Sequence, residues 1–409
     1  MTGSWQDLAP KGYRRGTHRL VAPDTTFEHL APLRAQMGIT RIANVTGLDR
    51  IGVPVVMVCR PNSRSIAVSQ GKGLDLAAAR ASGLMEAVET YHAERIDRPL
   101  KLATQSDLQA RHALIDVGGL AAVTDGRFDA NLRMLWIEGQ DLISQSPRWL
   151  PYETVHTDYT LPYPSGGGCF AASTNGLASG NHLLEAASHA ICEVVERDAT
   201  SLWNHQHPAL KEASRLDLDS VDDADCRQVA LRLQQVGFEV AAWDTTSDTG
   251  IPSFYCLIVD RRHEGAHSGA GAGAHPSRAV ALLRALTEAV QVRTTYIAGS
   301  RDDLHPDEFM PPAIDQKLGR ARALMAGCGP RRDFTAIPSH DGDSFAEDVA
   351  WLLERLRSVG IGQVVAVDLT RPELAIPVVR VVIPGLEGVD DHPRYLAGPR
   401  ALAAARRQP

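Results

Sequence analysis

The stretch GLASGNHLLEAASHAICEVVERDATSLW, residues 176–203, determines how the rest of the chain is interpreted. Its spacing predicts one helix, because apolar residues recur at helical intervals and form a stripe that would face a core. Glu185, Glu193 and Glu196 fall within roughly 80° of one another at about 100° per residue. A soluble helix does not normally carry acids beside its core stripe. The stretch therefore predicts a buried helix whose acidic face borders a cleft.

The same polar pattern, polar-x3-Glu-x2-Glu/Gln, occurs three times. The copies are Ser82, Glu86 and Glu89 in SGLMEAVE, His189, Glu193 and Glu196 in HAICEVVE, and Arg284, Glu288 and Gln291 in RALTEAVQ. In a helix each triplet spans roughly 60° and about 10 Å, so each forms one compact polar strip. Gly73 and Gly180 stand at the same offset from the first two strips (73 and 82, 180 and 189). We interpret this pattern as an internal duplication, with chance similarity between amphipathic helices as the alternative.

Composition narrows the class of protein. The 409 residues, 44% of them hydrophobic, can build a sizeable core, and a net charge of -7 without a basic stripe argues against nucleic-acid binding. No apolar run approaches the roughly 20 residues that span a bilayer, and the N-terminus lacks the apolar core of a signal peptide. We therefore expect a cytoplasmic protein. Six scattered cysteines without a C-x2-C pair indicate neither a zinc site nor a disulfide framework.

The order of predicted elements favours an α+β fold with mixed or antiparallel sheets flanked by helices. Runs 41–46 and 53–59 predict a hairpin, and 134–155 predicts two strands across a turn. Helices are predicted over 74–95, 277–298 and 314–326, helix-glycine-strand segments over 227–246 and 344–370, and single strands over 251–261 and 376–388. Because no low-complexity linker divides the chain, we expect one large domain over 41–400, between an arm, 1–40, and a tail, 401–409.

Glycine-rich segments precede the predicted polar helices. Lys72 lies between two glycines in SQGKG (69–73), where free backbone N–H groups and a cation could hold phosphate, although the P-loop spacing is absent. YPSGGGCFAASTNG (163–176) favours a ligand-facing loop, with a flexible loop as the alternative. GAHSGAGAGAHP (265–276) indicates a linker or a phosphate loop. Cys169 has no partnering motif, so we interpret it as a packing residue.

The acidic strips indicate a cation site. They exceed the two carboxylates that a glycosidase needs, and their mutual repulsion would have to be neutralised. Mg²⁺ takes oxygen ligands and bridges carboxylates to nucleotide phosphates. Glu185 and Glu196 are about 16 Å apart along one helix, so they cannot share an ion. Candidates to neutralise phosphate oxygens are Lys72, Arg197, Arg284 and Arg293. Structural ion pairs, Glu196–Arg197 and Glu288–Arg284, are the alternative.

Three segments resemble the ATP-binding motifs of YcaO-domain proteins: SQGKG–x8–SGLMEAVETY, STNGLASG–x4–EAASHAICEVVERDA, and GAHPSRAVALLRALTEAVQVR followed by GSRDD. IPVVRVVIPGLEG (376–388) resembles the closing strand of that family. The resemblance implies a YcaO-type domain, ATP and Mg²⁺ held by the acidic helices, and often a homodimer. It also implies activation of a peptide backbone amide by phosphorylation of its carbonyl oxygen.

The chain looks most like the stand-alone family members paired with TfuA-type proteins and associated with peptide thioamidation. Azoline-forming members carry a leader-binding module and a Pro-x-Pro-x-Pro tail, whereas this chain begins its first motif at Ser69 and ends ArgArgGlnPro. We expect a thioamide synthetase subunit of ribosomal-peptide (RiPP) biosynthesis, with a TfuA-type partner that supplies or delivers sulfur. The alternatives are an azoline-forming cyclodehydratase, an ATP-dependent transferase acting on a small molecule, and a non-catalytic nucleotide-binding subunit.

The resemblance implies a role for each matching residue. The expected Mg²⁺ ligands are Glu86, Glu89, Glu193 and Glu196, followed by Glu185. The expected phosphate contacts are Lys72, Arg197, Arg284 and Arg293, with Arg197 and Arg284 as the catalytic cations. Hydrogen bonds to nucleotide or bound water are expected from Ser82, Asn175 and Gln291. His189 departs from the family pattern, in which a small Ser or Ala is common. No general base is expected, because the amide oxygen itself attacks the γ-phosphate.

Overall fold

The computed structural model describes residues 3–262 and 267–408, and these form two compact units. The first unit comprises the chain up to Lys11, Val88–His205 and Gly342–Arg407, and the second comprises Gly12–Ala87 and Gln206–Asp341. Helix α2 (Leu76–Ala93) contributes residues to both. The domain boundaries at 40 and 400 stay predictions, and the ends of the expected arm and tail, 1–2 and 409, lie outside the described residues. None of the described helices is long and apolar enough to cross a bilayer.

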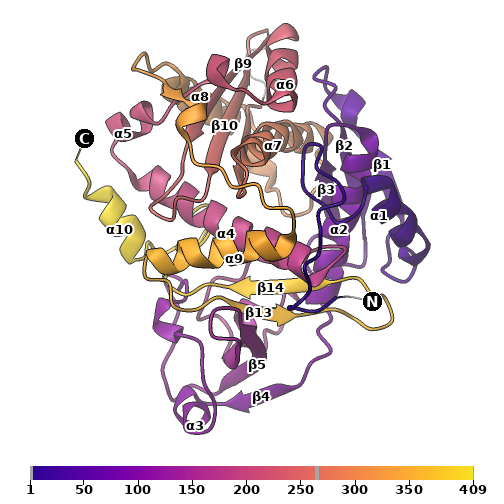
Figure 1. Ribbon diagram of the computed structural model, residues 1–409, viewed down its shortest axis with the longest axis vertical. Coiled ribbons are helices and arrows are strands. Elements are labelled where there is room, and N and C mark those ends of the chain that lie inside the picture. Colours follow the sequence, from indigo (N-terminus) through magenta and orange to yellow (C-terminus); the bar gives the residue numbers. More distant parts are fainter. Residues whose placement is uncertain (1–2, 263–266, 409) are drawn as a thin grey trace. The chain divides into compact units, whose positions relative to one another are not determined.

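A six-stranded sheet of antiparallel pairs organises the first unit. Its order is β4-β5-β13-β14-β7, with β6 also paired to β5. The strands are β4 (Leu100–Ala103), β5 (Met134–Asp141), β6 (Ser146–Pro151), β7 (Leu177–Ser179), β13 (Val365–Asp368) and β14 (Val378–Val382), and the helices are α3 (Gln105–Gln109), α4 (Leu183–His205), α9 (Phe345–Ser358) and α10 (Pro399–Ala405). Figure 1 shows α4 and α9 lying over β13 and β14. Because Val378, Val379 and Val381 are buried, the sheet and these helices share one core.

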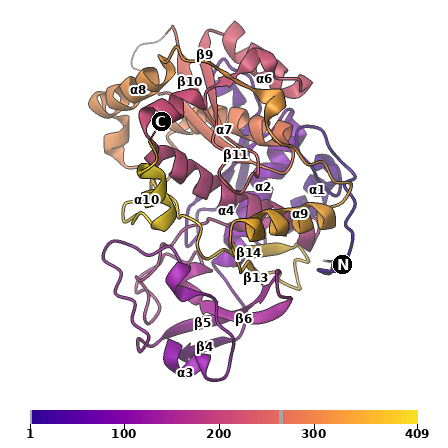
Figure 2. The ribbon, with the colours of Figure 1, turned by 60° about the vertical axis from the view of Figure 1, so that its left-hand side comes forward.

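The second unit contains two three-stranded antiparallel sheets. One joins β1 (Arg41–Asn44), β2 (Val55–Cys59) and β3 (Val68–Lys72), and the other joins β9 (Phe238–Asp244), β10 (Ser253–Asp260) and β11 (Gly269–Ala274). The short strands β8 (Leu216–Asp217) and β12 (Arg332–Asp333) form a parallel pair. Its further helices are α1 (Pro23–Leu30), α5 (Pro208–Ala213), α6 (Ala224–Gln235), α7 (Arg278–Ala298) and α8 (Pro311–Met325). Figure 2 shows β9 and β10 beside α6 and α7, with which they share a core that includes Phe238 and Phe254. The fold is thus α+β, as expected, and its described sheets are antiparallel apart from the parallel pair of β8 and β12.

Half of the glycine-rich segment 265–276 is a strand, residues 269–274, so its interpretation as a linker or phosphate loop was wrong. Residues 265–266 lie outside the described residues, and β11 follows from Gly269. A Cβ on Gly269, Gly271 or Gly273 would lie 2.0, 2.3 or 2.2 Å from a backbone carbonyl oxygen of α7. Those carbonyls recur every fourth residue, at Ala289, Ala285 and Ala281. The alternating glycines therefore leave a bare face on which α7 lies directly.

The three polar strips occur in three strand-helix pairs of identical register. In β3–α2, β7–α4 and β11–α7 the helix begins four residues after the strand ends (72 and 76, 179 and 183, 274 and 278). The first polar position is then the seventh helical residue each time, namely 82, 189 and 284. The common register supports the interpretation of an internal duplication. It also corrects the prediction that 176–203 is one helix, because residues 177–179 form a strand.

Helix α4 is tied to the C-terminal part of the first unit through Asp198. This carboxylate is fully buried and accepts hydrogen bonds from Arg400 Nε and Nη2, both at 2.9 Å, and from the backbone N–H of Glu387 at 2.9 Å. Replacing Asp198 by Ala would leave the Arg400 guanidinium without its bidentate partner.

We therefore expect Asp198→Ala to lower the free energy of unfolding by about 3–5 kcal/mol, measured by urea denaturation. The matched control is Glu373→Ala, which removes the exposed partner of Arg371 and should change stability by less than about 1 kcal/mol. Equal effects of the two substitutions would contradict the structural role given to Asp198.

Candidate active site

Each polar strip is the partly accessible face of a helix that is otherwise mostly buried. On α2 the half-buried strip is Ser82, Glu86 and Glu89, and on α7 it is Arg284, Glu288 and Gln291. On α4 the half-buried positions are His189, Glu193 and Arg197, whereas Glu185 and Glu196 are buried. Polar side chains that are neither solvated nor fully enclosed are typical of a ligand-binding surface rather than of a plain protein exterior.

In the second unit the structure brings the QGKG segment to the strip of α7. Lys72, the last residue of β3, forms an ion pair with Glu288. Gln291 donates from Nε2 to Oε1 of the buried Gln70, at 3.2 Å. Glu288 also accepts a hydrogen bond from the backbone N–H of Ala272, at 3.4 Å. Two of the predicted site residues, Lys72 and Gln291, thus lie on the same surface.

Burial raises the pKa of Glu86 from 4.5 to about 7. The cations of Arg301 and Lys72 and a backbone hydrogen bond from Gln70 oppose this rise, while the Glu288 carboxylate adds to it. A carboxyl group with a pKa near neutrality is readily held ionised by an additional cation. Arg301 was not predicted to belong to this group, although the GSRDD segment that contains it was noticed in the sequence.

The raised pKa of Glu86 gives an expected pH dependence in metal-free buffer. The folded protein binds this proton more tightly than the unfolded chain, so the stabilisation is present at low pH and is lost as pH rises from about 4.5 to 7. In EDTA we expect the free energy of unfolding of the wild type to fall by about 1–3 kcal/mol over this pH range, and we expect Glu86→Gln to lack this fall. Urea denaturation at several pH values measures the free energy of unfolding of both proteins. The control, Glu354→Gln on the exposed face of α9, should retain the wild-type slope.

In the first unit hydrogen bonds orient several of the predicted ligands. Glu89 accepts from the backbone N–H and the hydroxyl of Ser179, at 2.9 and 2.8 Å. Glu185 accepts from the backbone N–H of Asn181 at 3.1 Å, at the start of α4. These contacts fix one carboxylate against the end of β7 and another at the first turn of the helix.

Arg380 of β14 lies close enough to Glu193 to interact with it electrostatically. Its guanidinium is 3% exposed and donates to the backbone carbonyls of Thr154, at 3.0 Å, and Ser173, at 2.8 Å. Burial lowers the pKa of Arg380, and the Glu193 carboxylate opposes this shift. The sequence analysis did not identify Arg380, because the pattern of β14 is that of an apolar strand. Only the tertiary fold brings Arg380 close to α4.

Two other predicted residues have distinct surroundings. Asn175 is half-buried, and its Oδ1 has no hydrogen-bond partner within the described chain. Arg293 donates from Nε to Asp49 at 2.6 Å, pairs with Asp260 at 3.4 Å and donates from Nη1 to the carbonyl of His267. Arg293 also lies nine residues from Arg284, on the opposite side of α7 at about 100° per residue. We therefore leave Arg293 out of the phosphate-binding group proposed below.

The side chains of the strips are of the kind that would hold Mg²⁺ and a nucleotide. Carboxylate oxygens are the ligands that Mg²⁺ prefers, and the half-buried Glu86, Glu89 and Glu193 supply them from two helices. Lysine and arginine accompany them at Lys72, Arg197 and Arg284, as binding of phosphate oxygens requires. These side chains are therefore of the kind found in proteins that bind a metal-nucleotide complex.

The family follows from relatives of the chain. The protein-family model described as YcaO cyclodehydratase, binding ATP and Mg²⁺, matches residues 70–387. A protein from the tfuA 3′ region of Rhizobium leguminosarum bv. trifolii is 38% identical over 404 residues, which are 95% of this chain and 93% of that protein. A protein from Methanothermobacter thermautotrophicus is 34% identical over 90% of this chain and 94% of its own length. The chain belongs to the YcaO family, and this confirms ATP and Mg²⁺ as its cofactors.

Solved structures agree with the family. The YcaO protein of Methanopyrus kandleri, bound with AMPPCP and Mg²⁺, superposes with a TM-score of 0.75 over 96% of this chain and 99% of its own, at 24% identity. A heterocyclase solved in complex with substrate and cofactor gives a TM-score of 0.77 over 93% of this chain, at 25% identity. The present chain spans 54% of the heterocyclase chain. The resemblance to the YcaO fold therefore covers nearly the whole sequence.

Proposed function

We propose that the protein activates a backbone amide of a peptide or protein with ATP and, together with a TfuA-type partner, converts it to a thioamide. The observation that carries this proposal is the 38% identity, over nearly the full length of both chains, to a protein of the tfuA 3′ region. In the proposed reaction the amide oxygen is phosphorylated at the expense of ATP, and sulfide replaces it as phosphate leaves. The products are the thioamide, ADP and phosphate.

The polar strips supply the groups that this reaction needs. In the proposal Mg²⁺ ions, which would neutralise the triphosphate, are held by Glu86, Glu89, Glu193 and Glu196. Glu185 is a further ligand, and it binds a different ion from Glu196 because the two lie about 16 Å apart along α4. Phosphate oxygens are bound by Lys72, Arg197 and Arg284, and hydrogen bonds to nucleotide or water come from Ser82, Asn175 and Gln291. The half-burial of the strips, the pKa of Glu86 and the contact of Lys72 with the α7 strip support these assignments.

Cyclodehydration is the second candidate. It uses the same activation, but a neighbouring Cys, Ser or Thr side chain of the peptide attacks in place of sulfide and an azoline ring forms. The similarity to a heterocyclase over 93% of this chain favours it. The two reactions differ in product mass, because one exchanges oxygen for sulfur and the other loses water.

Mass spectrometry of a candidate peptide tests the proposal. The peptide is incubated with this protein, a TfuA-type protein, Mg–ATP and sulfide. We expect the mass increase of one oxygen-to-sulfur exchange, with phosphate released only when all components are present. Loss of one water would establish cyclodehydration instead, and an unchanged peptide with ATP intact would contradict both.

The resemblance also supports a homodimer, which light scattering of the purified protein would test.

A further inference from the structure

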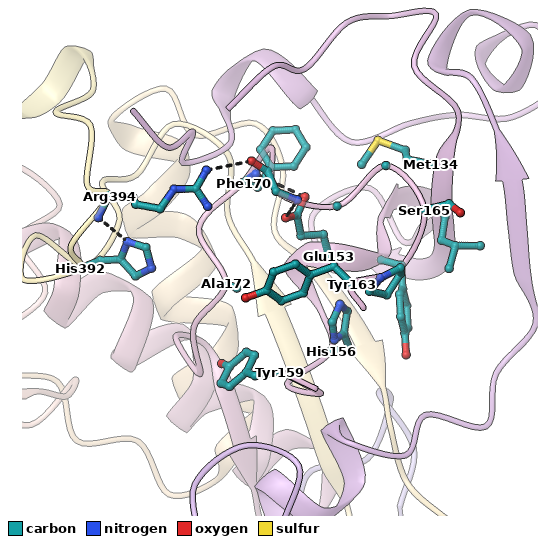
Figure 3. Close-up of a pocket in the computed structure, with 16 residues that line it drawn as sticks. Met134, Glu153, His156, Tyr159, Tyr163, Ser165, Phe170, Ala172, His392 and Arg394 are labelled. Atoms are coloured by element: carbon teal, nitrogen blue, oxygen red, sulfur yellow. Dashed lines mark hydrogen bonds between the residues drawn. The ribbon is translucent and has the colours of Figure 1, made fainter. Parts of the chain in front are cut away.

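A cavity of about 250 Å³ lies within the first unit and is separate from the polar strips. Its walls come from the start of β5, from the segment 152–172 and from residues 392–394 (Figure 3). Six of the sixteen lining residues carry aromatic or imidazole rings, among them Tyr152, His156, Tyr159, Tyr163 and Phe170. None of the residues predicted to bind metal or nucleotide lines it. Its volume is below the roughly 300–1,000 Å³ of whole small-molecule sites, so it suits one side chain rather than a nucleotide.

The glycine wall of this cavity is held in place. The carboxylate of Glu153 accepts hydrogen bonds from the backbone N–H groups of Gly168, Cys169 and Phe170, the last two at 3.1 and 3.3 Å. Arg394 donates to the carbonyl of Gly168 at 3.2 Å from the other side. Figure 3 shows Glu153 pointing at the backbone of Phe170 rather than into solvent. A wall fixed in this way is pre-organised for an occupant, which lowers the entropic cost of binding.

Burial disfavours the charged forms of three titratable groups around the cavity. Burial raises the pKa values of Glu153 and Tyr159 and lowers that of His156. Two lining side chains that can carry charge already have partners, because Glu153 accepts from the three backbone N–H groups and Arg394 donates to Asp125 and to the carbonyl of Gly168. A charged occupant would therefore lose its hydration without a counter-charge that is not already paired. Since aromatic rings also gain from edge-to-face contact with one another, the lining favours an uncharged, ring-bearing occupant.

The loop that lines the cavity carries exposed large side chains. Tyr163, which lines the cavity, is 59% exposed, and Leu161 in the same loop is 76% exposed. Exposed apolar groups beside an apolar cavity mark a surface that binds a further molecule.

The wall of the cavity leads directly to a proposed metal ligand. Ala172 lines the cavity, and seven residues later Ser179 donates two hydrogen bonds to Glu89. An extended chain spans no more than about 3.6 Å per residue, so Ala172 and Ser179 lie at most roughly 25 Å apart. A peptide whose amide lies at the Glu89 strip would therefore reach the cavity within about seven of its own residues.

We propose that this cavity binds one uncharged, ring-bearing side chain of the peptide substrate, no more than about seven residues from the modified amide. This inference rests on the proposed function, because it assumes that a peptide occupies the acidic strip. It adds to that function a preference for one type of residue in the peptide substrate. The cavity that would produce this preference is separate from the proposed nucleotide site.

Binding of small probes by saturation-transfer NMR tests the proposal. The probes are N-acetyl-L-phenylalaninamide and N-acetylglycinamide, which differ in the ring. We expect the ring-bearing probe to bind about tenfold more tightly or better. Ala172→Leu, which fills the cavity, should abolish the preference, whereas Thr174→Leu, on the exposed part of the same loop, should leave it unchanged.

A second variant keeps the test informative if Ala172→Leu fails to fold. Tyr163→Ala removes an exposed ring from the mouth and should weaken the ring-bearing probe severalfold without disturbing the fold. Equal binding of both probes, or a preference that survives Ala172→Leu, would overturn the proposal. Titration with Mg–AMPPCP is run in parallel and should be unchanged in every variant. If the wild-type protein failed to bind Mg–AMPPCP the proposed function would fall, while the probe experiment would still decide on the cavity.

Discussion

Replacing Glu193 and Glu196 together by Gln is expected to weaken binding of Mg–AMPPCP at least about 100-fold and to abolish ATP turnover. Both residues lie on α4, where Glu193 is half-buried beside Arg380 and Glu196 is 3% exposed. Glutamine keeps the shape of each side chain but removes the negative charge that a hard divalent cation requires. Isothermal titration calorimetry in the presence and absence of Mg²⁺ measures the loss.

The control for this double substitution is Glu354→Gln on α9. Glu354 is an exposed helical glutamate of the same unit and should leave both affinity and turnover unchanged. Near-ultraviolet circular dichroism would verify that the double variant keeps its tertiary packing. Unaltered Mg–AMPPCP affinity in the folded double variant would exclude these carboxylates as metal ligands.

Replacing Gly271 by Val is expected to destabilise the second unit strongly. The new Cβ would lie 2.3 Å from the carbonyl oxygen of Ala285 and 2.4 Å from the backbone nitrogen of Ala289. Backbone atoms of a helix cannot move aside singly, so α7 would have to separate from β11. We expect a loss of roughly 3 kcal/mol or more in the free energy of unfolding, measured by urea denaturation.

Gly319→Ala provides the matched control for the glycine substitution. Gly319 lies in the middle of α8, and a Cβ there meets no atom within 4 Å. Alanine is the better helix former, so this change should raise stability by about 0.5–1 kcal/mol. A Gly271→Val protein as stable as the wild type would mean that α7 does not lie directly on the glycine face of β11.

The polar helices could be predicted because their pattern is local. Apolar spacing and the recurring Glu positions define α2 and α7 to within a few residues, and β-branched runs define the hairpin of β1 and β2. The start of α4 was predicted seven residues too early, because strand β7 precedes the helix within the same apolar stretch. Strand β11 was misread because alternating glycine and alanine lack the β-branched residues that normally indicate a strand. Strand β4 was missed because its four residues, LKLA, are too short to show a period.

The partners of the strips could not be predicted, since they depend on contacts between distant segments. Arg301 near Glu86, Ser179 at Glu89 and Arg380 near Glu193 are each separated from their partners by many residues. The position of Arg293 away from the polar strip of α7 could have been predicted from the sequence. Its position nine residues after Arg284 already places it on the opposite side of one helix.

Crystallography of the protein with AMPPCP and Mn²⁺ in place of Mg²⁺ tests the central claim most directly, because anomalous scattering locates each Mn²⁺ ion. The account predicts Mn²⁺ bound by carboxylates of the acidic strips, with Glu89 and Glu193 among the ligands, and nucleotide phosphates contacted by Lys72 or Arg197. Metal and nucleotide bound elsewhere, with those carboxylates turned to solvent, would contradict it.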